Sequence, residues 1–160
     1  GGARAGGPGR PINGPATRAG THHPGAFGGG VYGGEARLAS GPEASAFGLL
    51  LQGSSDLQSF FYVMITGDGR YDIGYCERDC QVQESLIGGF TLGHSILADY
   101  QTNRIRVELR GGVLTLSVNG TPLGQVEGLE TGEGLVGLIG ESAAYGGFEA
   151  LFDNLQVVEG

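Results

Sequence analysis

Hydrophobic and polar positions alternate along two neighbouring segments in the middle of the chain. In NRIRVELR, residues 103–110, Ile105, Val107 and Leu109 share one face, and charged side chains take the other. After a Gly-Gly pair, VLTLSVN, residues 113–119, continues the same alternation and ends on an Asn-Gly dipeptide. Alternation with period two, joined by turn residues, predicts a half-buried antiparallel hairpin.

Other segments of the chain also read as strands. The continuous apolar run SFFYVMIT, residues 59–66, is typical of a strand covered on both faces, and RYDIGYC, residues 70–76, follows after Gly-Asp-Gly. Shorter candidates lie at 31–38, 46–52, 122–127 and 134–140. No stretch sustains a helical period. Many short strands at this spacing predict an all-β, antiparallel sandwich or barrel.

The last segment, FEALFDNLQVVEG, residues 148–160, changes its parity part of the way along. The apolar residues up to Phe152 keep one parity, whereas Leu155 and Val157 keep the other. In a regular strand this change would turn one apolar group toward solvent. The segment therefore needs an irregularity between the two groups.

Composition separates the first thirty residues from the rest. Residues 1–30 contain 11 of the 34 Gly, four of the six Pro, and Arg4, Arg10 and Arg18 without any acid. Residues 31–160 contain the other six Arg and all 17 acids, so they carry a formal charge of 6 − 17 = −11. A segment so poor in apolar residues cannot fold by itself. We expect a basic arm or linker followed by one sandwich domain.

Charge and hydropathy exclude two kinds of partner. The formal net charge is −8, and nucleic acids and anionic membranes both require a basic face. No apolar run approaches the roughly 20 residues of a membrane span. We therefore predict no nucleic-acid partner and no direct membrane insertion.

An ordered set of segments resembles the bacterial concanavalin A-like (laminin G-like) jelly-roll domains, which are similar in fold to legume lectins and laminarinase-type glucanases. The segments are GPEASAFGLLLQG, FFYVMITGDGRYDI, NRIRVELRGGVLTLSVNGTPL, GEGLVGLIG and FDNLQV. They run from about Glu35 to Val158. The resemblance implies a jelly-roll sandwich of two antiparallel sheets, with a concave and a convex face.

The resemblance also suggests how the final strand changes parity. A bulge at Asp153 and Asn154 would insert one residue, so that Phe152 and Leu155 both face the core. The Asp and Asn side chains would then satisfy backbone groups that the bulge frees. A calcium ion on Asp153 is the alternative, but no dense acidic loop supplies the six to eight oxygens that calcium prefers. We predict no metal and no other cofactor.

The front of the chain departs from the family pattern. Where family members open with one or two further strands, this sequence has the Gly-rich arm. An incomplete sheet has an exposed edge that another chain can complete. We expect the arm of one copy, with its three Arg, to pack along a neighbouring copy. The alternative is a simple linker.

This sequence lacks the carboxylate spacing found in the glucanases of similar fold. Those enzymes carry Glu-x-Asp-x-x-Glu on one strand, and retaining hydrolysis needs two carboxyl groups about 5–5.5 Å apart. The nearest string here is ERDCQVQE, in which Glu77 and Asp79 are followed by an acid only at Glu84. We therefore predict that the protein is not an enzyme.

The same segment contains both cysteines, Cys76 and Cys80, with three residues between them. A local disulfide would tighten a hairpin and would fit an extracytoplasmic setting. Reduced thiols are the alternative. A zinc site is not favoured, because it requires about four ligands.

Sugar binding is the other function that the resemblance implies. Sugar rings are commonly laid on flat aromatic side chains. The chain has no Trp, and Tyr100 and Tyr145 lie in loop-like stretches where either could contact a glycan. Half-buried packing is the alternative role for both.

Two functional interpretations follow from the sequence. The first is a non-catalytic structural or interaction module, extracellular or on the cell surface, that binds copies of itself or another surface protein through its arm and sheet edge. The alternative is a carbohydrate-binding, lectin-like module that recognises a surface or extracellular polysaccharide.

Overall fold

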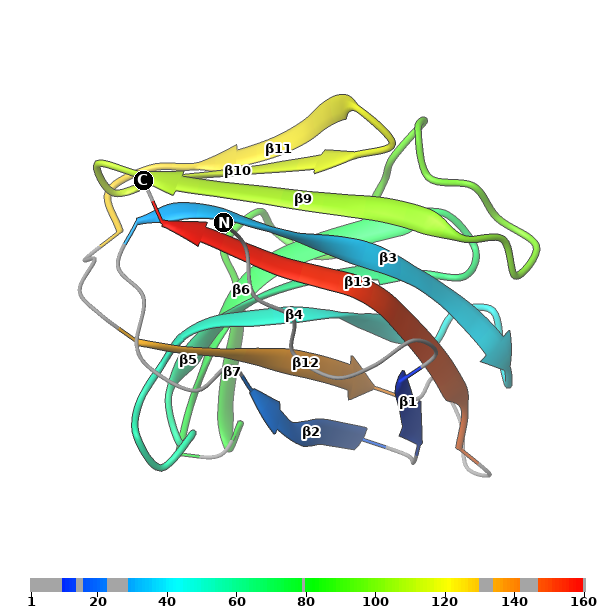
Figure 1. The fold of residues 1–160 in the computed structure, drawn as a ribbon, viewed down its shortest axis with the longest axis horizontal. Helices are drawn as coiled ribbons and strands as arrows, with labels where there is room; N and C mark the ends of the chain where they lie inside the picture. Colours follow the sequence, from blue (N-terminus) through cyan, green and yellow to red (C-terminus); the bar gives the residue numbers. More distant parts are fainter. Residues whose placement is uncertain are drawn as a thin grey trace.

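The computed structural model describes residues 10–13, 16–22, 29–78, 80–129, 134–141 and 147–159, with the backbone alone for 10–13, 16–22 and 159. All of its regular elements are β-strands, arranged in two layers (Figure 1). The predicted antiparallel two-sheet sandwich is confirmed. Within the described ranges, no helix is long and apolar enough to cross a bilayer.

Every strand pair in both sheets is antiparallel. The six-stranded sheet has the order β1 (Arg10–Asn13), β13 (Glu149–Glu159), β3 (Gly30–Ser40), β9 (Asn103–Arg110), β10 (Val113–Val118) and β11 (Thr121–Val126). The seven-stranded sheet has the order β2 (Ala16–His22), β12 (Leu135–Glu141), β4 (Ala46–Gly53), β5 (Phe60–Thr66), β6 (Arg70–Glu77) and β7 (Val82–Ser85), and β8 (Thr91–Leu92) pairs with β6.

The predicted hairpin forms from β9 and β10. Leu109 pairs with Leu114, and both are buried between the sheets. The Gly-Gly turn has both residues at positive φ, 58° and 77°, as a type I′ turn requires. Local turn chemistry and apolar alternation therefore agree on the same register.

Side chains from both sheets fill the space between the layers. Phe47 of β4 and Phe152 of β13 meet edge to face, with ring centroids 6.2 Å apart. In β5, Val63 and Ile65 face this core, whereas Tyr62 and its even-numbered neighbours belong to a second buried cluster on the opposite face of the sheet. The continuous apolar run is thus covered on both faces, as predicted.

The predicted bulge lies at the expected place in β13. Its register with β3 shifts between Asp153 and Gln156, and Asn154 takes a left-handed φ of 52°. Phe152 and Leu155, on either side, are both buried in the main core. The Asp153 carboxylate accepts a hydrogen bond from the backbone N–H of Asn154 at 2.7 Å. The bulge therefore explains how the apolar residues of β13 change parity and still face the core.

Two segments of the arm form the outermost strands. β1 pairs with β13, placing Arg10 opposite Phe152, and β2 pairs with β12, placing Arg18 opposite Ile139. These edges are therefore paired within one chain, whereas the sequence suggested that another copy would complete them. Arg4 lies outside the described residues. The division of the chain at residue 30 and a role of the three Arg in assembly stay predictions.

Candidate functional site

The outer face of the seven-stranded sheet is formed by β4, β5, β6 and β12. Apolar side chains there, among them Leu50 and Met64, are fully buried. Cys76, at the end of β6, belongs to the same cluster and forms a disulfide with Cys80 in the following turn. Arg78 and Cys80 both have positive φ, because the chain must reverse within this short closed loop. The disulfide thus joins the end of β6 to its turn.

A buried hydrogen-bonded network lies on this face. The Tyr62 hydroxyl donates to Asp72 Oδ2 at 2.8 Å, and the Ser85 hydroxyl donates to Asp72 Oδ1 at 2.6 Å. Asp72 is only 3% exposed, so the two hydroxyls replace the water that the carboxylate would otherwise bind. Burial, and then the hydrogen bond and charge of Asp72, raise the pKa of the Tyr62 hydroxyl.

Side chains also meet across this face. Gln83 of β7 donates weakly to the Tyr62 hydroxyl at 3.5 Å and to Glu141 Oε2 of β12 at 3.4 Å. Three strands separate β7 from β12 in the sheet order, so the sheet must curl for these side chains to touch. Side chains of β7 and β12 thus contact one another across the outer face of this sheet.

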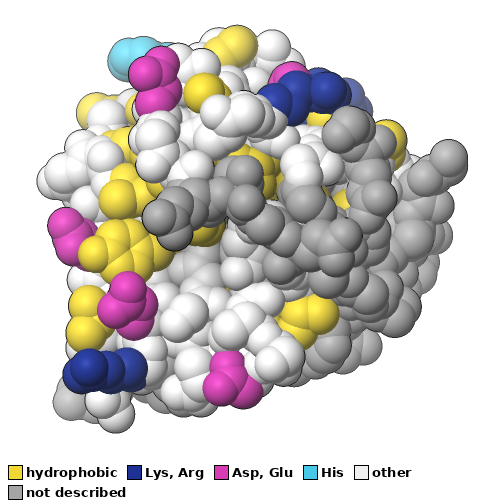
Figure 2. Space-filling model, turned by 90° about the vertical axis from the view of Figure 1, so that its left-hand side faces the viewer, with side chains coloured by type: hydrophobic (Ala, Val, Ile, Leu, Met, Phe, Trp, Pro, Cys, Tyr) yellow, Lys and Arg dark blue, Asp and Glu magenta, His cyan; other side chains and the backbone are white. Residues whose placement is uncertain are grey.

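One of the acidic residues predicted to be non-catalytic has a structural partner. Glu84 accepts a hydrogen bond from the Tyr75 hydroxyl at 2.6 Å, and this bond raises the pKa of Tyr75. Glu77 ends β6, and Asp79 lies outside the described residues. The described part of the face in Figure 2 shows acidic side chains that lie apart from one another, some of them near basic side chains. No group of three or more metal-ligating side chains occurs among the described residues.

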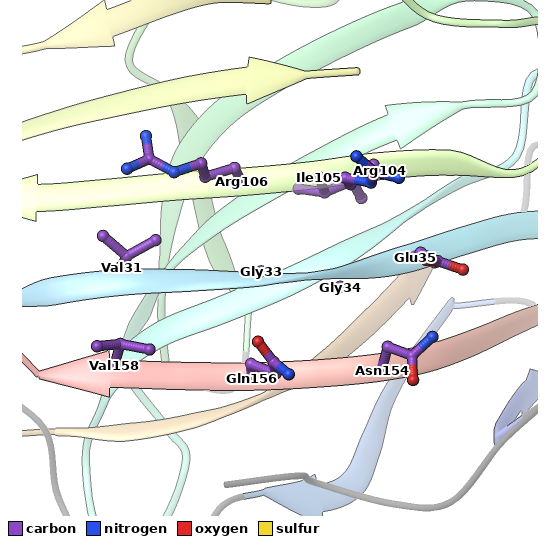
Figure 3. Close-up of a pocket in the computed structure, with 10 residues that line it drawn as sticks. All are labelled: Val31, Gly33, Gly34, Glu35, Arg104, Ile105, Arg106, Asn154, Gln156 and Val158. Atoms are coloured by element: carbon purple, nitrogen blue, oxygen red, sulfur yellow. The ribbon is translucent and has the colours of Figure 1, made fainter. Parts of the chain in front are cut away.

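An open groove lies on the outer face of the six-stranded sheet, across β9, β3 and β13 (Figure 3). We call it the outer groove. Its volume is about 400 Å³. It is lined by Val31, Gly33, Gly34, Glu35, Arg104, Ile105, Arg106, Asn154, Gln156 and Val158.

The register of three strands creates the outer groove. Gly33 of β3 pairs with Arg106 of β9 on one side and with Gln156 of β13 on the other. A β-carbon on Gly33 would approach the Ile105 carbonyl oxygen to 3.1 Å, so the strands pack closely there. Because glycine has no side chain, the longer neighbours form the walls of the groove and Gly33 lies on its floor.

Several polar groups at the outer groove lack protein partners. Among the described residues, the side chains of Arg104, Gln156 and Glu35 make no hydrogen bond or ion pair. Arg106, by contrast, lies 3.3 Å from Glu108. Unpaired guanidinium, amide and carboxylate groups leave donors and acceptors available to a ligand. The arrangement can therefore bind a polar molecule lying across the strands.

A smaller pocket of about 210 Å³ extends the outer groove. It shares Glu35 and adds Arg37, Thr102 and Asp153 among its lining residues. From Val31 to Arg37, β3 spans about 20 Å at the usual rise per residue. The two pockets together can therefore accommodate an extended ligand.

Of the two tyrosines predicted to contact a glycan, only Tyr100 is described. Its hydroxyl donates to the Gly41 carbonyl at 3.0 Å, and the residue remains 40% exposed. It lies two residues before Thr102, which lines the smaller pocket. Tyr145 lies outside the described residues. The hydroxyl of Tyr100 thus has a packing role, while part of its ring stays open.

No sequence motif marks the residues of the outer groove as a site. Alternation placed Arg104 and Arg106 on a polar face, which is the ordinary arrangement of a half-buried strand. The missing information was which segment lies beside them. The available signal was the Gly33-Gly34 pair within a predicted strand, because glycine inside a strand often marks a close approach of backbone or ligand.

Comparison with known proteins identifies the fold. No family model and no curated protein sequence matches the chain. The carbohydrate-binding module CBM66 from Bacillus subtilis is similar in structure, with a TM-score of 0.69 and 11% identity over 94% of this chain and 97% of that one. A β-glucanase from Bacillus licheniformis gives a TM-score of 0.64 at 6% identity, covering 94% of this chain and 78% of that one.

Sheep galectin-11, solved in complex with glycerol, is also similar, with a TM-score of 0.59 and 11% identity over 93% of this chain and 98% of that one. At these identities the similarity establishes the fold. The chain has the concanavalin A-like jelly-roll fold of lectins and glucanases, which confirms the resemblance seen in its sequence.

Proposed function

We propose that this protein is a non-catalytic carbohydrate-binding module of an extracellular or cell-surface protein. The observation that carries the proposal is the outer groove, with its unpaired polar side chains around the glycine floor. The disulfide between Cys76 and Cys80 is consistent with an oxidising compartment.

The chemistry of the outer groove suits a sugar chain. Sugar hydroxyls both donate and accept hydrogen bonds, and Arg104, Gln156 and Glu35 together offer both functions. Val31 and Val158 add apolar contacts at one end, where a sugar ring can place its C–H groups. A few convergent polar groups beside apolar surface are typical of small-molecule and sugar sites.

The similar structures support the binding interpretation without deciding it. They include a carbohydrate-binding module and a galectin, and also glucanases and alginate lyases. A shared fold is weak support for a shared activity. The non-catalytic part of the proposal rests on the spacing of Glu77, Asp79 and Glu84, which differs from that of the glucanases.

Self-association is a second candidate, favoured by one observation. The arm supplies the edge strands β1 and β2, and short terminal strands can exchange between copies. Such an exchange predicts that the mass of the intact chain increases with concentration. Sedimentation of the intact chain over a wide concentration range tests this, and a constant monomer mass would contradict it.

Affinity electrophoresis through gels that contain neutral or acidic polysaccharides tests the proposed function. We expect retention by at least one polymer. Gln156→Ala should weaken retention about tenfold, which corresponds to about 1.4 kcal/mol. Gln125→Ala is the matched control, because Gln125 is an exposed amide on β11, bonded to Thr115 and outside the groove.

Two outcomes would contradict the proposed function. The first is a wild-type chain that no polysaccharide retains. The second is equal weakening by Gln156→Ala and Gln125→Ala. The non-catalytic part has its own assay, because Glu35 and Asp153 occupy paired positions on β3 and β13. Release of reducing ends by the wild type, abolished by Glu35→Gln, would show that the protein is a hydrolase.

A further inference from the structure

We propose that the glycan bound in the outer groove carries carboxylate groups, so that the ligand is an acidic, uronate-containing polysaccharide. This inference rests on the proposed function and names its ligand class. The feature that carries it is the Arg104 guanidinium, which lines the groove without any anionic partner among the described residues.

The other arginines of β9 differ from Arg104. Glu108 lies 3.3 Å from Arg106 and 2.7 Å from Arg110, so one carboxylate partly neutralises both. Arg104 pairs in register with Glu35 of β3, yet the two form no ion pair. Figure 3 shows that their side chains do not point toward one another. The guanidinium group of Arg104 is therefore available to a carboxylate from outside the protein.

Arginine is well matched to this ligand. Its planar guanidinium can donate two parallel hydrogen bonds to one carboxylate, and such charge-assisted pairs are shorter and stronger than neutral hydrogen bonds. Across the groove, Gln156 offers its amide group to a hydroxyl of the same sugar chain. A carboxylate bound to Arg104 and a hydroxyl bound to Gln156 would give both side chains a partner.

The net charge of −8 opposes the binding of a polyanion. Glu35 is the one acid among the residues that line the groove, and its side chain does not point toward Arg104 (Figure 3). The acids that do not line the groove act mainly at longer range. At physiological salt, charges more than about 8 Å apart are largely screened. The direct contact with Arg104 is screened much less. We therefore expect recognition of individual carboxylates in the groove and no general affinity for polyanions.

The test compares acidic polysaccharides with their methyl esters, which keep the sugar backbone and remove the charge. The probes are polygalacturonate, alginate and hyaluronate, and a neutral β-glucan is included. We expect at least one acidic polymer to bind at least tenfold more tightly than its ester. Arg104→Gln should remove this preference, and Arg104→Lys should restore it in part, since lysine keeps the charge without the fork.

Arg110→Gln is the matched control, because Arg110 lies on the same strand and is exposed, but is ion-paired outside the groove. It should change binding less than twofold. The inference fails if a neutral polymer or an ester binds as tightly as the acids, or if Arg104→Gln weakens ester and acid equally. In those cases the proposed function stands. If no polymer binds, both the inference and the proposed function are wrong.

Discussion

At the scale of single residues, Asn154 contributes both to the fold and to the outer groove. Its left-handed backbone lets β13 absorb one extra residue, so that the apolar residues on both sides reach the core. The same bulge places the Asn154 side chain in the outer groove. Bulges commonly redirect a side chain beside a functional site.

The cost of this conformation can be measured with two substitutions. Asn154→Gly and Asn154→Ala both remove the amide, but only alanine is strained at a φ of 52°. We expect Asn154→Ala to be less stable than Asn154→Gly by about 1 kcal/mol in urea unfolding. Equal stabilities would show that this strand does not need the left-handed conformation.

Because Tyr62 is buried and bonded to Asp72, we expect the free energy of unfolding to depend on pH in the alkaline range. The pKa of Tyr62 is raised in the folded state, chiefly by burial, so its neutral form is favoured there. The resulting stability is complete below the unfolded pKa of about 10 and is lost as the pH rises through the folded value. The free energy of unfolding should therefore fall with pH above about 10.

Tyr62→Phe isolates the contribution of this hydroxyl to the alkaline loss of stability. The variant should be less stable at pH 7, because Asp72 loses a buried donor at a typical cost of about 1–3 kcal/mol. Its stability should also fall less steeply above pH 10 than that of the wild type. Parallel curves for the two proteins would contradict the assignment.

At the scale of elements, two asparagines organise the loop before β9. Asn103 is 2% exposed, and its amide accepts from the Leu97 N–H at 2.7 Å and donates to the Leu97 carbonyl at 2.9 Å. Asn119, at positive φ, donates to Asn103 Oδ1 and to the Ser95 carbonyl. Asn103 and Asn119, which lie in two separate segments of the sequence, thus anchor the same loop.

Removing this anchor should loosen the loop that carries Tyr100. Asn103→Ala should lower the free energy of unfolding by about 1–3 kcal/mol, because it removes the hydrogen bonds that the Asn103 amide makes with Leu97 and Asn119. Backbone amides of residues 95–101 should exchange with solvent faster. Gln101→Ala, an exposed amide in the same loop, is the control and should change stability by less than about 0.5 kcal/mol. Equal effects would refute the anchoring role.

The disulfide loop at the end of β6 is a second element with a measurable effect. Replacing both Cys76 and Cys80 by alanine should cost about 2 kcal/mol, the chain-entropy value for so short a loop. Thermal unfolding under oxidising and reducing conditions measures this. If reduction leaves the wild-type transition unchanged, the disulfide contributes nothing to stability.

The sequence predicts the elements of this fold better than its site. Alternation and turn residues locate β9 and β10, and the parity change in β13 locates the bulge, because these signals are local. The outer groove depends on Gly33 lying between Arg106 and Gln156. That register joins segments more than fifty residues apart, and no local pattern specifies it.

At the scale of the whole molecule, the two outer faces of the sandwich differ. The seven-stranded sheet is curled, and Leu50, Tyr62 and Met64 on its outer face are buried. The six-stranded sheet carries the open outer groove. We therefore propose that ligands bind on the six-stranded sheet.

Backbone amide chemical shifts, followed during titration with a retained oligosaccharide, test that claim directly. We expect the largest shift changes at the amides of Gly33 and Gly34 of β3 and at their neighbours on β9 and β13. The amide shifts of Gly48 and Gly74, on the seven-stranded sheet, should barely change. Large changes at Gly48 and Gly74 with none at Gly33 would place binding on the opposite face and show that the proposal is wrong.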